Sequence, residues 1–214
     1  MKISILCSDE KHPVVSHLQG WVRDGATRGH DIRLVHDKSG LTDGDILFLV
    51  SCTQLIRPDV RARFKATLVL HASDLPEGRG WSPHIWSVLR GGTGFTVTLL
   101  EAAEPVDSGA IWLKTTCSLE GHELLPEIEA KLFAAELSLM TQAVEKFQAI
   151  RPVPQAGEPG QSLPRRTPAD SRLDVNKTLA EQFDLLRVVD AQRFPAFFEH
   201  RGHRYVLKIE KTSP

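Results

Sequence analysis

Residues 68–90, LVLHASDLPEGRGWSPHIWSVLR, contain a strand, a loop and a helix in immediate succession. The apolar run before His71 predicts a buried strand, and Gly78 and Gly80 predict a loop whose backbone can approach a ligand closely. Ser82 and Pro83 predict the start of a helix, because proline is well suited to a first helical turn. A strand that leads through a loop into a helix is the repeating unit of an α/β sheet, so this stretch sets the fold class.

The same alternation extends over the rest of the chain. Strands are predicted at residues 2–7, 31–36, 45–50, 66–70, 96–101 and 110–116, and helices at 8–29, near Pro58, at 82–90 and at 124–147, the first capped by Ser8 or Asp9. We therefore expect an α/β fold with a Rossmann-like, mostly parallel, doubly wound sheet that is covered on both faces. Ligands of such sheets bind outside the carboxyl ends of the strands, which directs attention to the residues after Val50 and Leu70 and around Asp107.

A segment rich in proline and glycine divides the chain. Residues 151–164 read RPVPQAGEPGQSLP, a composition that cannot continue the preceding helix. We expect a main domain of residues 1–150, a linker of residues 151–168 and a small C-terminal region of residues 169–214. In that last region, an amphipathic helix is predicted at 179–189 and a hairpin at 194–199 and 204–210. Residues 1–150 carry a net charge of −4 and residues 151–214 a net charge of +3.

Composition and local motifs exclude several classes of protein. The 26 Lys and Arg residues against 27 Asp and Glu give no basic excess for nucleic acid, and no apolar run reaches the ~18–20 residues of a membrane span. Three scattered cysteines fit a reducing cytoplasm. The segment after the first strand lacks the glycine motifs that hold a dinucleotide. The histidines lack the spacing of metal ligands, so we expect no metal.

Two stretches together resemble a known family. Residues 71–80, HASDLPEGRG, resemble the H-x-S-x-L-P-x-x-x-G signature of the N10-formyltetrahydrofolate-dependent formyltransferases, and residues 106–111, VDSGAI, resemble that family's D-[TS]-G segment. Taken alone, His71 could be a structural histidine and Asp107 a turn residue, but the two motifs occur in the family's order. Residues 167–177, TPADSRLDVNK, resemble the start of the C-terminal region of methionyl-tRNA and sugar formyltransferases.

The resemblance implies an N-formyltransferase. The sequence around Trp81 is most similar to that of short cytoplasmic enzymes of the pseudaminic-acid-pathway type. We therefore expect formyl transfer from N10-formyltetrahydrofolate to a nucleotide-linked amino sugar, such as a UDP-linked 4-amino-4,6-dideoxy sugar. We expect no tRNA partner, because the chain ends after one hairpin and lacks a basic surface. His71 would take the proton of the attacking amine, and Asp107 would orient the imidazole and stabilise its cation. Residues 1–150 would then be the catalytic domain.

The resemblance also indicates where the two substrates bind. The folate would lie against the loops after Val50 and before Asp107, and its candidate contacts are Ser51, Cys52, Leu75, Leu100, Ala102 and Val106. A nucleotide can be bound by backbone N–H groups at a helix start, by cationic side chains and by an aromatic ring that stacks on the base. The candidates are the backbone at Gly80 and Trp81, the cations Lys11 and Arg79, and the ring of Phe198.

One position departs from the family's pattern. The family places an asparagine two residues before the histidine, where this chain has Val69. Loss of one donor to a developing oxyanion costs about 3 kcal/mol, so we expect another donor, a backbone N–H or protonated His71, to take its place. The alternatives at this position are a slower enzyme and a catalytically idle folate- or nucleotide-binding module. Independently of Val69, another small acceptor such as glycinamide ribonucleotide is an alternative to the amino sugar. A role of the C-terminal region in homodimerisation is a further alternative.

Overall fold

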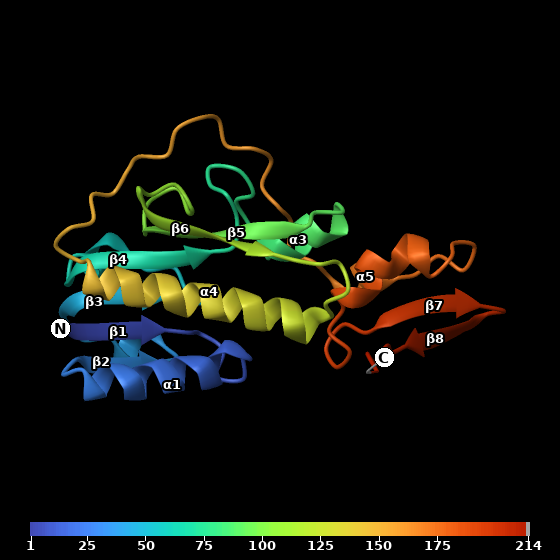
Figure 1. Cartoon of the computed structure of the whole chain (residues 1–214), viewed down its shortest axis with the longest axis horizontal. Coiled ribbons are helices and arrows are strands. Elements are labelled where there is room, and N and C mark those ends of the chain that lie inside the picture. Colours follow the sequence, from blue (N-terminus) through green and yellow to red (C-terminus); the bar gives the residue numbers. More distant parts are fainter. Residues whose placement is uncertain (213–214) are drawn as a thin grey trace.

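A six-stranded sheet forms the centre of the computed structural model, which describes residues 1–212 (Figure 1). Its strand order is β2-β1-β3-β4-β5-β6, and the β7-β8 hairpin forms a second, separate sheet. The first four strands in this order are parallel, whereas β5 and β6 run antiparallel to their neighbours. The mostly parallel, Rossmann-like sheet predicted from the sequence is therefore confirmed. The strands are β1 (Lys2–Leu6), β2 (Asp31–Val35), β3 (Gly44–Leu49), β4 (Phe64–His71), β5 (Gly94–Glu101), β6 (Ile111–Ser118), β7 (Ala196–His200) and β8 (His203–Leu207).

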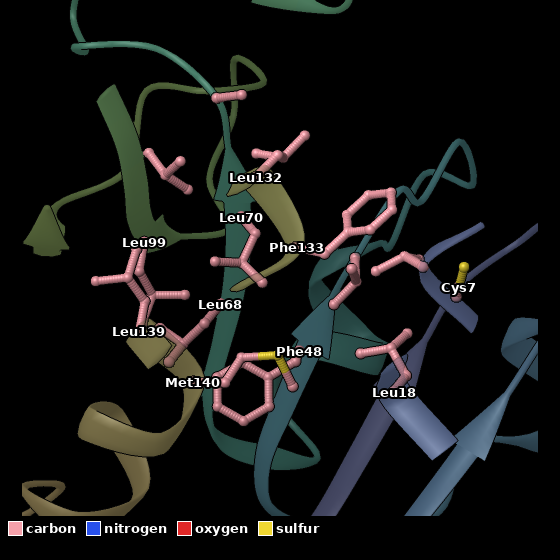
Figure 2. Packing of buried hydrophobic residues seen from close by; sticks show 14 of the residues in the cluster. Cys7, Leu18, Phe48, Leu68, Leu70, Leu99, Leu132, Phe133, Leu139 and Met140 are labelled. Atoms are coloured by element: carbon pink, nitrogen blue, oxygen red, sulfur yellow. The ribbon is translucent and has the colours of Figure 1, made fainter. Parts of the chain in front are cut away.

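Three helices cover one face of the sheet. In Figure 1, α1 (Val14–Thr27) and α4 (Leu125–Glu145) lie along this face, and α3 (Pro83–Leu89) contacts β5. Figure 2 shows how Leu132, Phe133, Leu139 and Met140 of α4 point toward the strands. Opposite them lie buried residues of β3, β4 and β5, namely Phe48, Leu68, Leu70 and Leu99. Burial of each large apolar side chain contributes about 1.5–3 kcal/mol to the free energy of folding, so this layer is the main source of stability.

The opposite face of the sheet has a thinner cover. Leu47 and Leu49 of β3 point to this face, where they form a small apolar cluster with Leu6, Leu41 and Ile56. The cover consists of α2 (Pro58–Arg61) and of loop residues, including those around the short helix η1 (Lys38–Gly40). Within residues 1–212, the model contains no helix of sufficient length and apolar character to cross a membrane.

The C-terminal region packs as a small unit on the end of the sheet. It contains η2 (Pro168–Ser171), η3 (Ala180–Gln182), α5 (Phe183–Arg187) and the hairpin, which pack around buried Leu173, Leu186 and Ala196. The hairpin turn places Arg201 and Gly202 at φ values of 50° and 80°, a left-handed pair that matches the twist of two antiparallel strands. The predicted hairpin is therefore confirmed.

Two helix predictions need correction. The first helix begins at Val14, not at Ser8 or Asp9, because Pro13 stands at its N-cap position and Asp9 instead accepts a hydrogen bond from Lys11 N in a separate turn. The predicted helix 179–189 is two short pieces, η3 and α5, which join at Gln182. The Gln182 side chain bonds to Asp174, Lys177 and Thr178, and these local bonds compete with a continuous helix.

A buried ionic cluster joins α5 to the main domain. Glu123 is 2% exposed and lies between Lys131 Nζ at 2.6 Å and Arg187 Nη1 at 3.6 Å. Burial by itself raises the pKa of Glu123, but the hydrogen bonds from Lys131 and from the N–H groups of Glu120 and Gly121 outweigh it and lower the pKa to about 2. Arg187 is equally buried and also bonds to Asp184 Oδ1 at 2.8 Å. Glu123 is therefore an ionised anchor for the C-terminal region.

A second buried carboxyl lies on the sheet-facing side of α4 without such support. Glu136 is 5% exposed, and its Oε2 has no hydrogen-bond partner among residues 1–212. Burial raises the pKa of this carboxyl to about 8. The side chain is consequently protonated in the folded protein at neutral pH, and its ionisation acts against folding.

We expect the Arg187→Met variant to lose about 2–4 kcal/mol of unfolding free energy, because it leaves part of the Glu123 charge uncompensated in the interior. Urea denaturation measures the loss, and hydrogen exchange should locate it first in α5 and the hairpin. Arg193→Met, at an exposed position of the same region, is the matched control. Equal stability of the two variants would show that the ionic cluster is not an anchor.

Stability should also depend on Glu136 and pH. Because the pKa of Glu136 rises from 4.5 to about 8 on folding, the folded state binds this proton more tightly, and stability falls as the pH rises from 4.5 through 8. Glu136→Gln keeps the shape and cannot ionise, so it should add about 4 kcal/mol at pH 8 and less than about 0.5 kcal/mol near pH 4.5. Urea titrations at both pH values test this, with Glu145→Gln at the exposed end of α4 as control. A pH-independent effect of Glu136→Gln would contradict the linkage.

Candidate active site

His71 is the last residue of β4 and lies at the carboxyl edge of the parallel strands. Its side chain is 9% exposed, and its Nε2 donates a hydrogen bond to the Gly78 carbonyl oxygen at 3.0 Å. Because a carbonyl oxygen can only accept, the neutral imidazole carries its proton on Nε2. The ring is therefore held by its own loop, and Nδ1 keeps a lone pair that can accept a proton.

Asp107 lies in the loop between β5 and β6, with a left-handed backbone at φ 60°. Its Oδ1 is 3.7 Å from His71 Nδ1, and its Oδ2 accepts a hydrogen bond from Gly80 N at 3.4 Å. A distance of 3.7 Å is too long for a hydrogen bond, so the carboxylate acts on the imidazole through its charge. The structure thus brings the two predicted catalytic residues together, while the Gly78 carbonyl, which sequence reasoning did not single out, fixes the ring.

Several contacts hold the loop that follows His71. Thr98 Oγ1 on β5 donates to the Ser73 carbonyl oxygen at 2.7 Å, and Lys114 Nζ on β6 bonds to Asp74 Oδ1 at 2.5 Å and to the Leu75 carbonyl oxygen at 2.8 Å. Gly109 must be glycine, because a Cβ there would collide with the backbone of Glu101. The antiparallel strands β5 and β6 therefore position both loops of the site.

Residues 151–167, which we call the strap, pass from the end of α4 beyond the β6 edge of the sheet toward α3 and α5 (Figure 1). The strap pairs with the main domain at two bridges, Val153 with Ile111 and Leu163 with Gly80. Between them, Gln155 Nε2 donates to the carbonyl oxygens of Asp107 and Gly109, each at 2.9 Å, and Gln155 Oε1 accepts from Arg79 Nη2 at 2.9 Å. The composition of this segment predicted a linker and gave no sign of these contacts.

The folate candidates lie in different surroundings. Cys52, after β3, and Ala102, after β5, pack against the same apolar cluster as Val69 and Leu49. Ser51 adopts a left-handed φ of 46°, and its carbonyl oxygen accepts from Ser8 Oγ. An apolar edge flanked by loop backbone suits a flat heteroaromatic ring. Leu75 and Leu100 are fully buried and could offer backbone groups only, whereas the Val106 side chain is 62% exposed.

The nucleotide candidates divide into two groups. Arg79, Gly80 and Trp81 adjoin the strap, where the Arg165 guanidinium lies 4.9 Å from the centre of the Trp81 ring. Arg79 Nε is buried without a hydrogen-bond partner among the described residues. By contrast, Phe198 stacks on Tyr205 and contributes to the apolar cluster of the hairpin, so packing accounts for it. Lys11 is exposed in the turn after β1.

Other ionisable groups near the site do not offer a second nucleophile or a metal centre. Burial raises the pKa of the Cys52 thiol, which disfavours the reactive thiolate. Burial also lowers the pKa of His84 to about 4, so this histidine is neutral. Over residues 1–212, no three or more His, Cys, Asp and Glu side chains are grouped in a way that could hold a metal ion. His71 and Asp107 therefore remain the candidate groups for proton transfer at this site.

Known proteins share this fold over nearly the whole chain. A methionyl-tRNA formyltransferase from Clostridium thermocellum aligns with 100% of this chain and 94% of its own at a TM-score of 0.84 and 20% identity. For HypX from Aquifex aeolicus in complex with tetrahydrofolic acid, the TM-score is 0.79 at 20% identity, covering 98% of this chain and 37% of that one. A sugar N-formyltransferase from a Shewanella species gives 0.71 at 16% identity, covering 100% and 99%.

Sequence comparison identifies the family. The methionyl-tRNA formyltransferase of a Synechocystis strain is 27% identical over 173 residues, which are 79% of this chain and 51% of that protein, so the chain spans about half the length of this curated relative. The family model described as formyl transferase matches residues 24–144, more than half of the chain and the part that holds both His71 and Asp107. The chain belongs to the formyl transferase family.

Proposed function

We propose that this protein transfers the formyl group of N10-formyltetrahydrofolate to the amine of a nucleotide-linked amino sugar. The observation that carries this proposal is the pairing of His71 Nδ1 with Asp107 Oδ1 at 3.7 Å, outside the carboxyl end of β4 and within the part of the chain that matches the family. A histidine with one nitrogen committed and the other free beside a carboxylate is suited to accept and return one proton. Formyl transfer to an amine requires such a group.

The proton steps follow from the two side chains. His71 Nδ1 accepts the proton of the amine as the amine nitrogen bonds to the formyl carbon, and Asp107 stabilises the resulting imidazolium by its charge. As the bond between the formyl carbon and N10 breaks, His71 returns the proton to N10. The N-formyl product and tetrahydrofolate leave, and the enzyme regains its neutral imidazole. Donor and acceptor exchange one formyl group and one proton, so the reaction balances without a redox partner.

Val69 makes the free nitrogen of His71 more important. It lies two residues before His71 on the same strand, packs against the apolar cluster and has no hydrogen-bond donor in its side chain. His71 Nε2–H is already committed to Gly78. We infer that the Nδ1–H of protonated His71 donates to the formyl oxygen as negative charge develops there.

Donor and acceptor would approach from different sides of His71. Cys52 and Ala102 offer the folate ring an apolar edge, in line with the tetrahydrofolic acid bound by the structurally similar HypX. For the acceptor, the exposed Trp81 ring suits a base, and the Arg165 guanidinium beside it suits a diphosphate. We propose that residues 1–150 carry the reaction, with residues 151–168 as a connection and residues 169–214 as a small C-terminal unit.

A tRNA-linked amine is the second candidate acceptor. Two of the similar proteins are methionyl-tRNA formyltransferases, and one of them has a TM-score of 0.84 to this chain. The net charge of −1 over 214 residues favours a small acceptor instead, because tRNA binding depends on neutralised phosphates.

Formylation assays separate these acceptors. We expect purified protein with N10-formyltetrahydrofolate to formylate at least one of a panel of UDP-, dTDP- and GDP-linked amino sugars, and to leave methionyl-tRNA and glycinamide ribonucleotide unchanged. His71→Ala and Asp107→Asn should each lower kcat by about 10²–10⁴-fold, because each removes part of the proton path. His200→Ala, at an exposed hairpin position, is the control.

The outcomes are distinct. Turnover of methionyl-tRNA alone would assign the second acceptor. Folate binding without transfer to any amine would favour an idle binding module. Full activity of His71→Ala would remove histidine from the mechanism.

The tautomer of His71 is a separate prediction. Because the Gly78 carbonyl oxygen accepts from Nε2, ¹⁵N NMR of the neutral side chain should show the proton on Nε2 and an unprotonated Nδ1. The spectrum of His71→Gln identifies the signal by its absence. A neutral ring protonated on Nδ1 would mean that Nε2 is the proton-accepting atom, and the assignment of roles would have to be reversed.

A further inference from the structure

Gln155 makes more contacts with the site than any role in a linker requires. It stands in the strap, more than forty residues after Asp107, and is half-buried. Both of its amide hydrogens are used, one for each of the carbonyl oxygens of Asp107 and Gly109 at 2.9 Å. Its own carbonyl oxygen accepts from Arg79 Nη2 at 2.9 Å. One side chain therefore joins the carboxylate-bearing turn to the loop that follows His71.

The two carbonyl groups held by Gln155 belong to Asp107, the strained residue of the turn, and to Gly109. Asp107 adopts φ 60°, which is unfavourable for a residue with a Cβ, and such a conformation persists only where neighbouring groups hold it. Gly109 is fixed by its close approach to Glu101. Gln155 bonds to the Asp107 backbone itself, so it acts on the residue whose carboxylate faces His71.

The strap does not need Gln155 for its own attachment. The bridges of Val153 with Ile111 and of Leu163 with Gly80 hold it on either side. In addition, Trp86 Nε1 donates to the Pro164 carbonyl oxygen at 3.1 Å. The Gln155 amide is fully hydrogen-bonded toward the site, while other contacts anchor the strap. This arrangement indicates that Gln155 maintains the geometry of the site and is not needed to fold the strap.

We propose that Gln155 is a positioning residue that holds the Asp107 carboxylate at its distance from His71 Nδ1 and ties this turn to Arg79. The inference deepens the proposed function and rests on it for the effect on catalysis. Its geometric part, that Gln155 sets the surroundings of the His71 ring, can be tested without any substrate.

Two substitutions remove the bonds of the Gln155 amide in different ways. Gln155→Glu keeps an acceptor for Arg79 but loses the N–H donors, so its carboxylate faces two carbonyl oxygens. Gln155→Met keeps the length and removes all three bonds. We expect both to lower kcat by about 10–100-fold, because misplacement of a catalytic group by about 1 Å can cost about 10²-fold. KM for both substrates should change less than threefold. Gln161→Met, exposed on the same strap, should behave as wild type.

A double-mutant cycle tests whether Gln155 acts through Asp107. If it does, Gln155→Met should lower kcat less than threefold further in an Asp107→Asn background, since the interaction it supports is already lost. Fully additive losses would overturn the proposal, as would an effect confined to KM. Thermal unfolding checks that Gln155→Met keeps a melting temperature within about 3 °C of wild type, as expected for a residue whose segment is anchored elsewhere.

NMR of the protein without folate or amine provides the readout that does not depend on activity. The ¹⁵N resonances of the His71 ring should move in Gln155→Met in the same direction as in Asp107→Asn, and should not move in Gln161→Met. Unchanged ¹⁵N resonances of the His71 ring in Gln155→Met would overturn the positioning role even if activity were lost. If these resonances shift but the protein formylates no amine, the positioning role of Gln155 stands and the proposed function is overturned.

Discussion

The site depends on one constraint: the Asp107 carboxylate must approach the buried His71 imidazole. The two residues come from different parts of the chain, because His71 ends β4 and Asp107 lies in the loop between β5 and β6. Strand β5 runs antiparallel to β4 and pairs Thr98 with His71. β5 begins at the edge where the parallel strands end and stops at Glu101, opposite Leu68, so the loop after β5 must fold back to bring Asp107 to His71. The pairing of β5 with β4 stops at Leu68, which leaves the loop after β5 within reach of His71.

The approach of Asp107 to His71 also requires hydrogen-bond partners for the backbone groups of the loop that follows His71. These partners come from residues outside that loop. Gly78 accepts from His71, Gly80 donates to Asp107, and Leu163 of the strap pairs with Gly80. Each of these contacts uses a main-chain group that would otherwise be left unpaired in a partly buried loop, which is costly. The loop that follows His71 and the strap thus stabilise each other, and the segment that the composition marks as a linker lies against the candidate site.

The sequence predicts the parts of this structure that have a local pattern. Apolar runs located the strands to within a few residues, and the two family motifs identified His71 and Asp107. Gln155, the Gly78 carbonyl and the Glu123–Arg187 pair lay beyond reach, because each acts through contacts between distant segments and leaves no periodic signal. The helix start at Val14 was missed for a related reason: Ser8 and Asp9 are good capping residues, but Asp9 serves a turn of its own.

In the proposed reaction, Val69 and Gly78 together determine how many roles the His71 imidazole must take. Where a neighbouring side chain could donate to the formyl oxygen, a histidine would need only to move a proton. Here Val69 offers no donor, and the Nε2–H is committed to the Gly78 carbonyl. On our proposal, Nδ1 is therefore base, oxyanion donor and acid in succession, and every step depends on the position of one ring atom relative to Asp107. On the same proposal, the reaction tolerates little displacement of that carboxylate, so an amide on the strap that holds the Asp107 turn matters for the reaction.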